Sequence, residues 1–216
     1  MNQNIYVISG LGADHTVFCK LNLPGYTLVH VAWVPTVKGE SLNGYASRLL
    51  PQIKEENPIV LGLSLGGMLA VEVGQLIQTK KVISLSSVTA YSELPFHFKL
   101  AGWLRLQKIL PIYFFSKGNR FTQWIFGVKQ KEDREILNQV FVNLDKDFLY
   151  WALNAVLTWK NVEKPQNLQR IHGSSDLILP KRKKVSYNAV IEKGTHLMLL
   201  DQAEEVSTAI LNALKA

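Results

Sequence analysis

Short apolar runs recur along the chain and alternate with stretches whose apolar residues have helical spacing. The runs are four to six residues long and rich in β-branched side chains, a pattern typical of buried strands. The stretches between them repeat apolar side chains every three or four positions, which predicts helices packed on a sheet. The predicted strands are residues 5–8, 27–31, 59–63, 81–86, 168–172 and 187–191, and the predicted helices are residues 41–55, 70–77 and 201–214.

This alternation of strands and helices favours a parallel sheet covered by helices on both faces. The carboxyl ends of parallel strands meet at one edge of the sheet, and such sheets carry their chemistry at that edge. One predicted helix, residues 41–55, has a proline in its later part. Pro51 predicts a kink or an early end of that helix.

The alternation breaks between residues 89 and 164, where no strand pattern is visible. Helices are predicted there over 96–109, 120–126, 131–143 and 147–159. Four of the five Trp and eight of the nine Phe residues lie in this stretch. Two explanations carry equal weight: packing of a helical insert on the body, or a cap whose inner face lines an apolar pocket. We expect a single domain, with a core of residues 1–88 and 165–216 and a helical cap insert of residues 89–164.

The overall composition is that of a globular protein with one sizeable core. The chain has 216 residues, of which 47% are hydrophobic and 19% are charged. A net charge of +7 raises the question of an anionic partner, but the only dense basic run is residues 181–184. Neither stacking aromatic residues nor a nucleic-acid motif accompanies that run. A solvated surface is therefore the favoured interpretation, and we expect no nucleic-acid partner.

Cysteine usage and the start of the chain bear on the compartment. The one cysteine, Cys19, excludes an internal disulfide and fits a reducing environment. We interpret Cys19 as a small buried side chain. No basic leader with a long apolar stretch precedes the first strand, and the apolar run 59–71 is too short to span a bilayer. We expect a cytoplasmic protein without membrane insertion.

The turn after the third predicted strand carries a candidate nucleophile. Residues 62–67 have the sequence Gly-Leu-Ser-Leu-Gly-Gly, a G-x-S-x-G pattern between a buried strand and a helical stretch. So sharp a turn leaves no room for side chains beside Ser64, and Gly62 and Gly66 supply that room. Ser64 is then held in a strained backbone with its hydroxyl near the N–H groups that start the helix. The alternative is a glycine-rich turn whose serine only caps the helix.

Two further polar residues follow later strands. Asp176 ends a His-Gly-Ser-Ser-Asp sequence after strand 168–172, and His196 ends a Gly-Thr-His sequence after strand 187–191. Taken alone, Asp176 is well explained by a turn and His196 by a helix start. Together with Ser64, at the carboxyl ends of three parallel strands, they favour catalysis. His196 would take the serine proton, and Asp176 would hold the imidazole in the required tautomer.

Four other polar residues have weaker claims. Asp14 is placed to N-cap a short helix through about residue 20, and His15 beside it is a loop or helix-surface residue. His172 lies in the strand end that precedes the acid, and His97 lies in the insert. None of them has the spacing of a catalytic base.

The order Ser, Asp, His and the motifs around them resemble the α/β-hydrolase superfamily, and within it a small serine carboxylesterase. In this resemblance residues 62–66 are the nucleophile elbow, residues 172–176 the acid loop and residues 194–196 the histidine loop. The resemblance covers nearly the whole chain outside the insert. It implies a Ser64–Asp176–His196 triad that uses no metal and no organic cofactor.

The first predicted strand ends in Ser-Gly-Leu-Gly at residues 9–12, which resembles the oxyanion loop of that superfamily. The resemblance implies an oxyanion hole made by the backbone N–H groups of Leu11 and Leu65. The chain departs from the superfamily in starting directly at this strand, without the usual antiparallel strand pair. We expect a reduced, all-parallel six-stranded sheet, with the strands in spatial order 2-1-3-4-5-6.

The expected function is cleavage of a carboxylic ester, or a thioester, of a small apolar acyl substrate through an acyl-enzyme, by a monomer or homodimer. C–C bond hydrolysis, acyl transfer and amide cleavage are alternatives on the same fold, because one triad serves many substrates. A ligand sensor that keeps the triad and signals through its cap is an alternative of another class. A structural protein with a vestigial site is the weakest. Turnover of p-nitrophenyl esters indicates the enzyme, and one stoichiometric burst indicates the sensor.

Overall fold

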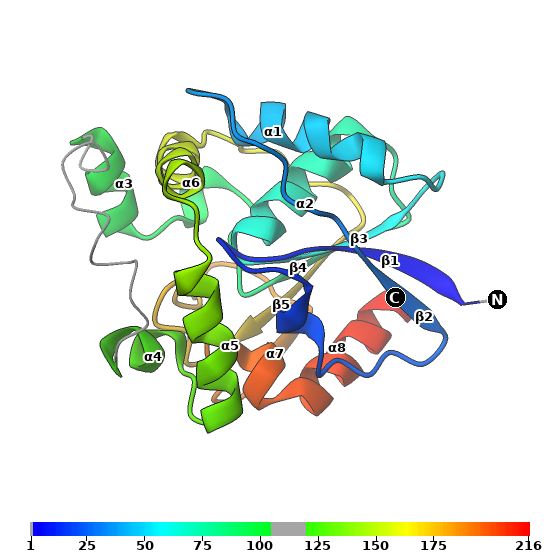
Figure 1. Cartoon of the computed structure of the whole chain (residues 1–216). Coiled ribbons are helices and arrows are strands. Elements are labelled where there is room, and N and C mark those ends of the chain that lie inside the picture. Colours follow the sequence, from blue (N-terminus) through cyan, green and yellow to red (C-terminus); the bar gives the residue numbers. More distant parts are fainter. Residues whose placement is uncertain (1, 105–119) are drawn as a thin grey trace.

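The computed structural model describes residues 2–104 and 120–216, and its centre is a six-stranded sheet (Figure 1). All neighbouring strands pair in parallel, in the order β2-β1-β3-β4-β5-β6, which confirms the predicted spatial order. The strands are β1 (Gln3–Ile8), β2 (Tyr26–His30), β3 (Ile59–Leu63), β4 (Lys81–Leu85), β5 (Leu168–Gly173) and β6 (Ala189–Ile191).

Helices cover both faces of this sheet (Figure 1). α1 (Leu42–Leu49) and α2 (Leu65–Leu76) lie on one face, and α7 (Met198–Asp201) and α8 (Ala203–Lys215) lie on the other. Side chains of β1 alternate between the two layers: Tyr6 and Ile8 pack with α1 and α2, whereas Ile5 and Val7 pack with α8. The central strand β3 is buried at every position, as expected for a strand with two covered faces.

Proline shortens the helix predicted over 41–55. α1 ends at Leu49 and passes into a single 3₁₀ turn, η2 (Leu50–Gln52), which contains Pro51. The early end is therefore confirmed, and its cause is the N–H that proline lacks.

The closing helix predicted over 201–214 is α8, which begins two residues later than predicted, because residue 201 ends the separate helix α7. Gln202 leaves the helical conformation (φ −132°, ψ 44°) and separates α7 from α8. Its side-chain amide donates a hydrogen bond to the carbonyl of Glu192, 3.0 Å away. This hydrogen bond holds the helix break against the loop after β6. The spacing of apolar residues in the sequence does not predict such a bond.

The loop after β1 forms a 3₁₀ turn, η1 (His15–Phe18), which Asp14 caps as predicted. The Asp14 carboxylate accepts the N–H of Thr16 at 2.9 Å. The prediction that the Cys19 side chain is buried is wrong, because Cys19 is exposed. Val17 and Phe18 take the buried positions, and the next residue along the turn faces solvent.

In its described part the segment between β4 and β5 contains helices joined by loops, and no strand. The helices are η3 (Tyr91–Glu93), α3 (Phe96–Trp103), α4 (Arg120–Phe126), α5 (Lys131–Val142) and α6 (Lys146–Thr158). The four predicted helices are therefore present, although residues 105–109 of the first prediction lie outside the described residues.

The aromatic residues of this segment divide into two groups. Trp151 and Trp159 are buried, as are Phe141 and Phe148. Trp103 and Trp124 are exposed by 79% and 64%. Packing on the body accounts for the first group only. Phe114 and Phe115, two of the eight Phe residues of this stretch, lie outside the described residues.

Candidate active site

The chain turns from β3 into α2 at Ser64, in a backbone conformation that a non-glycine residue rarely adopts. Ser64 has φ 53° and ψ −117°. Within the described part of the chain its side chain makes no capping hydrogen bond to α2. The strained elbow is thus present, and the alternative of a serine that only caps the helix is wrong.

The glycines of the elbow are required by close backbone packing. A Cβ atom on Gly62 would lie 2.0 Å from the carbonyl oxygen of Gly66, and one on Gly66 would lie 2.1 Å from the carbonyl oxygen of Ile8. Both distances are far inside van der Waals contact, and the obstructing atoms are backbone atoms that no rotamer change can move. The G-x-S-x-G pattern therefore holds the elbow directly against the end of β1.

The loop after β1 lies beside Ser64. A Cβ atom on Gly10 would lie 3.6 Å from the Cβ atom of Ser64, so this glycine borders the hydroxyl. Across residues 2–104 and 120–216, neither the N–H of Leu11 nor that of Leu65 donates a hydrogen bond to another residue. Leu65 is the first residue of α2, where the helix leaves N–H groups unpaired.

Two glycines also bring the loops after β5 and β6 together. A Cβ atom on Gly173 would lie 2.2 Å from the carbonyl oxygen of Gly194. The N–H groups of Ser174 and Ser175 donate to the carbonyls of Ile191 and Gly194, at 2.9 and 2.8 Å. The two loops therefore run side by side, and they carry Asp176 and His196 to the same place.

The three predicted residues meet at the carboxyl edge of the sheet. His196 Nε2 lies 2.9 Å from Ser64 Oγ, and His196 Nδ1 lies 2.8 Å from Asp176 Oδ2. Asp176 and His196 are buried, whereas Ser64 is half-buried and open to a reactant. Since a carboxylate only accepts, Nδ1 carries the proton and Nε2 is free to accept the serine hydroxyl.

Asp176 is held as an anion by its surroundings. Burial by itself raises the pKa of the carboxyl, but the adjoining His196 and the backbone N–H of Leu179 outweigh burial and lower that pKa. Asp176 Oδ1 accepts the N–H groups of Ile178 and Leu179, both at 2.9 Å, while Oδ2 faces His196. Each carboxylate oxygen thus has its own hydrogen-bond partners, and the carboxylate cannot rotate without losing those hydrogen bonds.

His172 supports the acid loop through a hydrogen bond from its side chain. Its Nε2 lies 2.7 Å from the carbonyl oxygen of Leu179, to which it donates, and 3.7 Å from Asp176 Oδ2. Burial lowers the pKa of His172 more than the neighbouring Asp176 raises it. A neutral His172 therefore leaves His196 as the hydrogen-bonded partner of the carboxylate.

Two residues contact the site in ways that the sequence did not specify: no prediction concerned Ser87, and Phe126 was only one of the eight Phe residues of the insert. The hydroxyl of Ser87, after β4, donates to the backbone carbonyl of Ser64 at 2.6 Å and so buttresses the elbow. Phe126, the last residue of α4, places its ring edge-on to the imidazole of His196, with ring centroids 5.6 Å apart. No local pattern marks either residue, because each contact joins segments that are far apart in the sequence.

The other singled-out histidines lie elsewhere. His15 packs near His30, with ring centroids 5.8 Å apart, and the exposed His97 packs against Phe98 on α3.

In residues 2–104 and 120–216 no cluster of three His, Cys, Asp or Glu side chains could hold a metal ion. A surface groove of about 720 Å³ lies between β6 and α8, lined by Gln169, Ala189 and Asn212 among others. It borders the starts of β5 and β6, the edge of the sheet opposite Ser64.

No protein-family model matches the chain, and no curated protein matches it. Solved structures do match over its whole length. A hydrolase from Pseudomonas aeruginosa PA01 has a TM-score of 0.73 at 13% identity, covering 100% of this chain and 91% of that one. The chain has the α/β-hydrolase fold.

Two further structures support this assignment. The esterase EaEST from Exiguobacterium antarcticum has a TM-score of 0.71 at 16% identity and covers 100% of this chain and 92% of its own. MenH from S. aureus has a TM-score of 0.71 at 16% identity and covers 100% and 94%. In this α/β-hydrolase fold the sheet is entirely parallel and the helical segment α3–α6 lies between β4 and β5.

Proposed function

We propose that the protein is a serine hydrolase that cleaves a carboxylic ester of a small apolar acyl substrate through an acyl-enzyme. The observation that supports this most directly is the continuous hydrogen-bonded path from Ser64 through His196 to Asp176, with N···O distances of 2.9 and 2.8 Å. The esterases and hydrolases that share the fold are consistent with the proposal. We place the activity in the cytoplasm and expect it to need no metal or organic cofactor.

The first chemical step follows from the direction of the hydrogen bonds. Ser64 Oγ attacks the ester carbonyl carbon while its proton passes to Nε2 of His196. The resulting imidazolium is stabilised by the Asp176 carboxylate on its other nitrogen. When the tetrahedral intermediate collapses, the C–O bond to the alcohol breaks and His196 returns the proton to the leaving oxygen.

Water completes the cycle by the same route. His196 takes a proton from a water molecule, whose oxygen attacks the acyl carbon, and the ester bond to Ser64 breaks with return of the proton to Oγ. In both halves the carbonyl oxygen becomes negative. We assign its stabilisation to the N–H groups of Leu65, the residue after Ser64, and of Leu11, the residue after the Gly10 that borders Ser64. Neither N–H has an acceptor within the described residues.

We further propose that residues 89–164 act as the cap over this site. Phe126 supports that role, because it brings an apolar ring from α4 to the edge of the His196 imidazole. Leu144 extends over the oxyanion loop, since a Cβ atom on Gly12 would lie 2.4 Å from its Cδ1 atom. An acyl group bound between them would gain affinity with each CH₂ that it buries, until the space is filled.

The test combines active-site labelling with turnover. Wild-type protein should react with a fluorophosphonate probe and hydrolyse p-nitrophenyl acetate and butyrate repeatedly. The Ser64→Ala variant should do neither, while Ser175→Ala, which removes an exposed hydroxyl in the acid loop, should do both. A single stoichiometric burst without turnover would assign the protein to ligand sensing, and absence of labelling would contradict an activated serine.

A further inference from the structure

The outer helices of the insert expose large apolar side chains. Phe96 and Trp103 on α3 are exposed by 74% and 79%, and Phe121 and Trp124 on α4 by 63% and 64%. In Figure 1 both helices lie at the outer left of the molecule, beyond α6 and α5. Each helix thus presents large exposed apolar side chains on the same side of the molecule, and such side chains mark interaction sites. We call the exposed side chains of α3 and α4 the outer surface: Phe96, Leu100, Trp103, Leu104, Arg120, Phe121 and Trp124.

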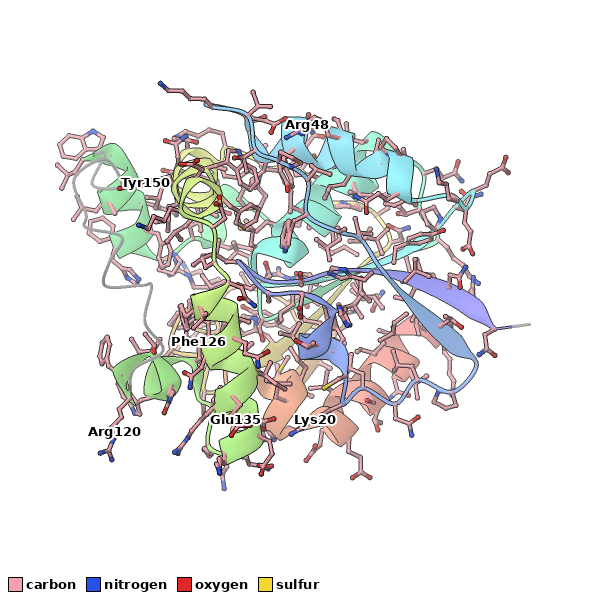
Figure 2. All side chains as sticks on the ribbon, in the orientation of Figure 1. Lys20, Arg48, Arg120, Phe126, Glu135 and Tyr150 are labelled. Carbon is pink, nitrogen blue, oxygen red and sulfur yellow. The ribbon has the colours of Figure 1, made fainter. Side chains whose placement is uncertain are left out.

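The charge of the chain is concentrated in the same stretch. Residues 94–131 contain seven of the 24 Lys and Arg residues and none of the 17 Asp and Glu residues. Four of the seven are among the described residues: Lys99, Arg120, Lys129 and Lys131. The rest of the chain therefore has 17 of each sign, and the whole net charge of +7 belongs to this stretch. Arg120 points away from the body of the protein in Figure 2, and it has no recorded ion pair within the described residues.

We propose that the outer surface docks onto an anionic phospholipid membrane. The exposed aromatic rings and Arg120, which forms no ion pair with the described residues, match the two parts of such an interface, the acyl boundary and the negative headgroups. Nucleic acid offers negative charge but little apolar surface for side chains on two separate helices. Among the described residues no helix is long and apolar enough to cross a bilayer, so the contact is with the membrane surface.

Docking by this surface would bring the active-site edge toward the lipid. α4 begins with Arg120 on the outer surface and ends with Phe126, whose ring contacts His196. The helix thus joins the docking residues to the site over two turns. The docking itself needs no chemistry at Ser64, so it can be tested in Ser64→Ala and does not depend on the proposed hydrolysis.

The experiment is co-sedimentation of the full chain with vesicles of phosphatidylcholine alone and of phosphatidylcholine with 30% phosphatidylserine. We expect binding to the anionic vesicles and at least ~10-fold weaker binding to the neutral ones, because each nearby Lys or Arg strengthens anionic-membrane binding roughly fivefold. The same result in Ser64→Ala would separate docking from catalysis.

Paired variants identify the surface. Phe96→Ser with Trp103→Ser removes apolar contacts of the outer surface. Arg120→Glu on that surface, with Lys131→Glu at the start of α5, reverses two exposed charges. Each pair should weaken binding at least ~10-fold. The matched controls are Val37→Ser for apolar exposure and Lys54→Glu with Lys80→Glu for charge. The latter changes the net charge equally at the opposite edge of the sheet, and both controls should bind like the wild type.

Any of the following outcomes would overturn the proposal. Equal binding to neutral and anionic vesicles, or none, would exclude an anionic membrane. Equal loss in the Lys54 and Lys80 control would mean that net charge alone acts. Selective binding of single-stranded nucleic acid without vesicle binding, or a solution dimer that the Phe96 and Trp103 variant dissociates, would assign the outer surface to a different partner.

Discussion

The strand-end loops and the helical insert are held in place by different means. Around Ser64, backbone approaches backbone so closely that only Gly62, Gly66 and Gly173 fit. The insert is attached by side chains instead: the indole N–H of Trp159 donates to the Glu72 carboxylate at 2.6 Å, and that of Trp151 donates to the Glu40 carbonyl at 2.9 Å. Chemistry and stability should therefore respond to different substitutions.

Contacts also differ within the insert. α5 and α6 place Phe141 and Phe148 in the two apolar clusters of the body, while α3 and α4 expose comparable rings. The acidic residues follow the same division. Asp133 on α5 is fully buried and pairs with Lys20 at 2.6 Å, whereas residues 94–131 contain no acid at all. Aromatic content alone therefore does not distinguish a packed helix from an exposed one.

The largest effect should come from Asp176→Asn. The amide would favour the wrong His196 tautomer without changing the shape of the loop, so kcat on p-nitrophenyl acetate should fall by roughly 10³–10⁴-fold. Unfolding in urea should show that the fold is kept. Asp14→Asn, at the exposed cap of η1, is the control and should retain full activity. A loss below tenfold in Asp176→Asn would require another acid.

Trp151→Ala should cause the largest loss of stability in the insert. The ring is buried, its centroid lies 4.1 Å from that of Tyr45, and its N–H is hydrogen-bonded. Removing it should lower the free energy of unfolding by about 3–5 kcal/mol. Trp124→Ala, at a 64% exposed position, should lower it by less than about 0.5 kcal/mol. Equal losses, measured by urea titration, would contradict the division of the insert.

Glu93→Gln tests the charged anchor at the start of the insert. The buried carboxylate accepts two hydrogen bonds from Arg170, at 3.0 and 2.7 Å, and one from Lys164 at 2.7 Å. Losing the charge should lower the free energy of unfolding by about 2–3 kcal/mol at pH 7.

The pH dependence of that effect has a definite sign. Burial raises the pKa of Glu93, but the hydrogen bonds from Lys164 and Thr89 and the charge of Arg170 lower it below its ordinary value of 4.5. The carboxylate therefore stabilises the fold above pH 4.5, and this contribution disappears as the pH falls through the lower folded-state pKa. Urea unfolding at a series of pH values should show a shallower acid loss in Glu93→Gln. Parallel curves would contradict the assignment.

The smallest effect should come from Ser87→Ala, at the residue whose hydroxyl supports the elbow. It removes the hydrogen bond to the Ser64 carbonyl and should cost about 1 kcal/mol of stability. We expect kcat to fall less than tenfold with KM unchanged, since Ser87 positions the nucleophile and does not touch substrate. Ser186→Ala, at an exposed position, should change neither constant.

Local sequence patterns were sufficient to predict the strands, the helices and the position of the nucleophile elbow in this protein. Short continuous apolar runs located the strands and helical spacing located the helices. The glycines at 62 and 66 marked the elbow because close backbone packing excludes side chains there. The parallel order then predicted that Ser64, Asp176 and His196 would share one edge, and they lie within hydrogen-bonding distance there. These features follow from short-range rules that each segment obeys by itself.

Only the tertiary structure decided which side chains from distant parts of the chain contact one another. Glu93 and Arg170 are 77 residues apart, and Ser64 and Ser87 are 23 apart, so no periodicity links them. The burial of Trp151 and the exposure of Trp103 were equally open, because both occur in apolar helical stretches. The break at Gln202 and the exposure of Cys19 have the same origin. Each depends on what a distant segment places against it, and that placement is a property of the packed chain.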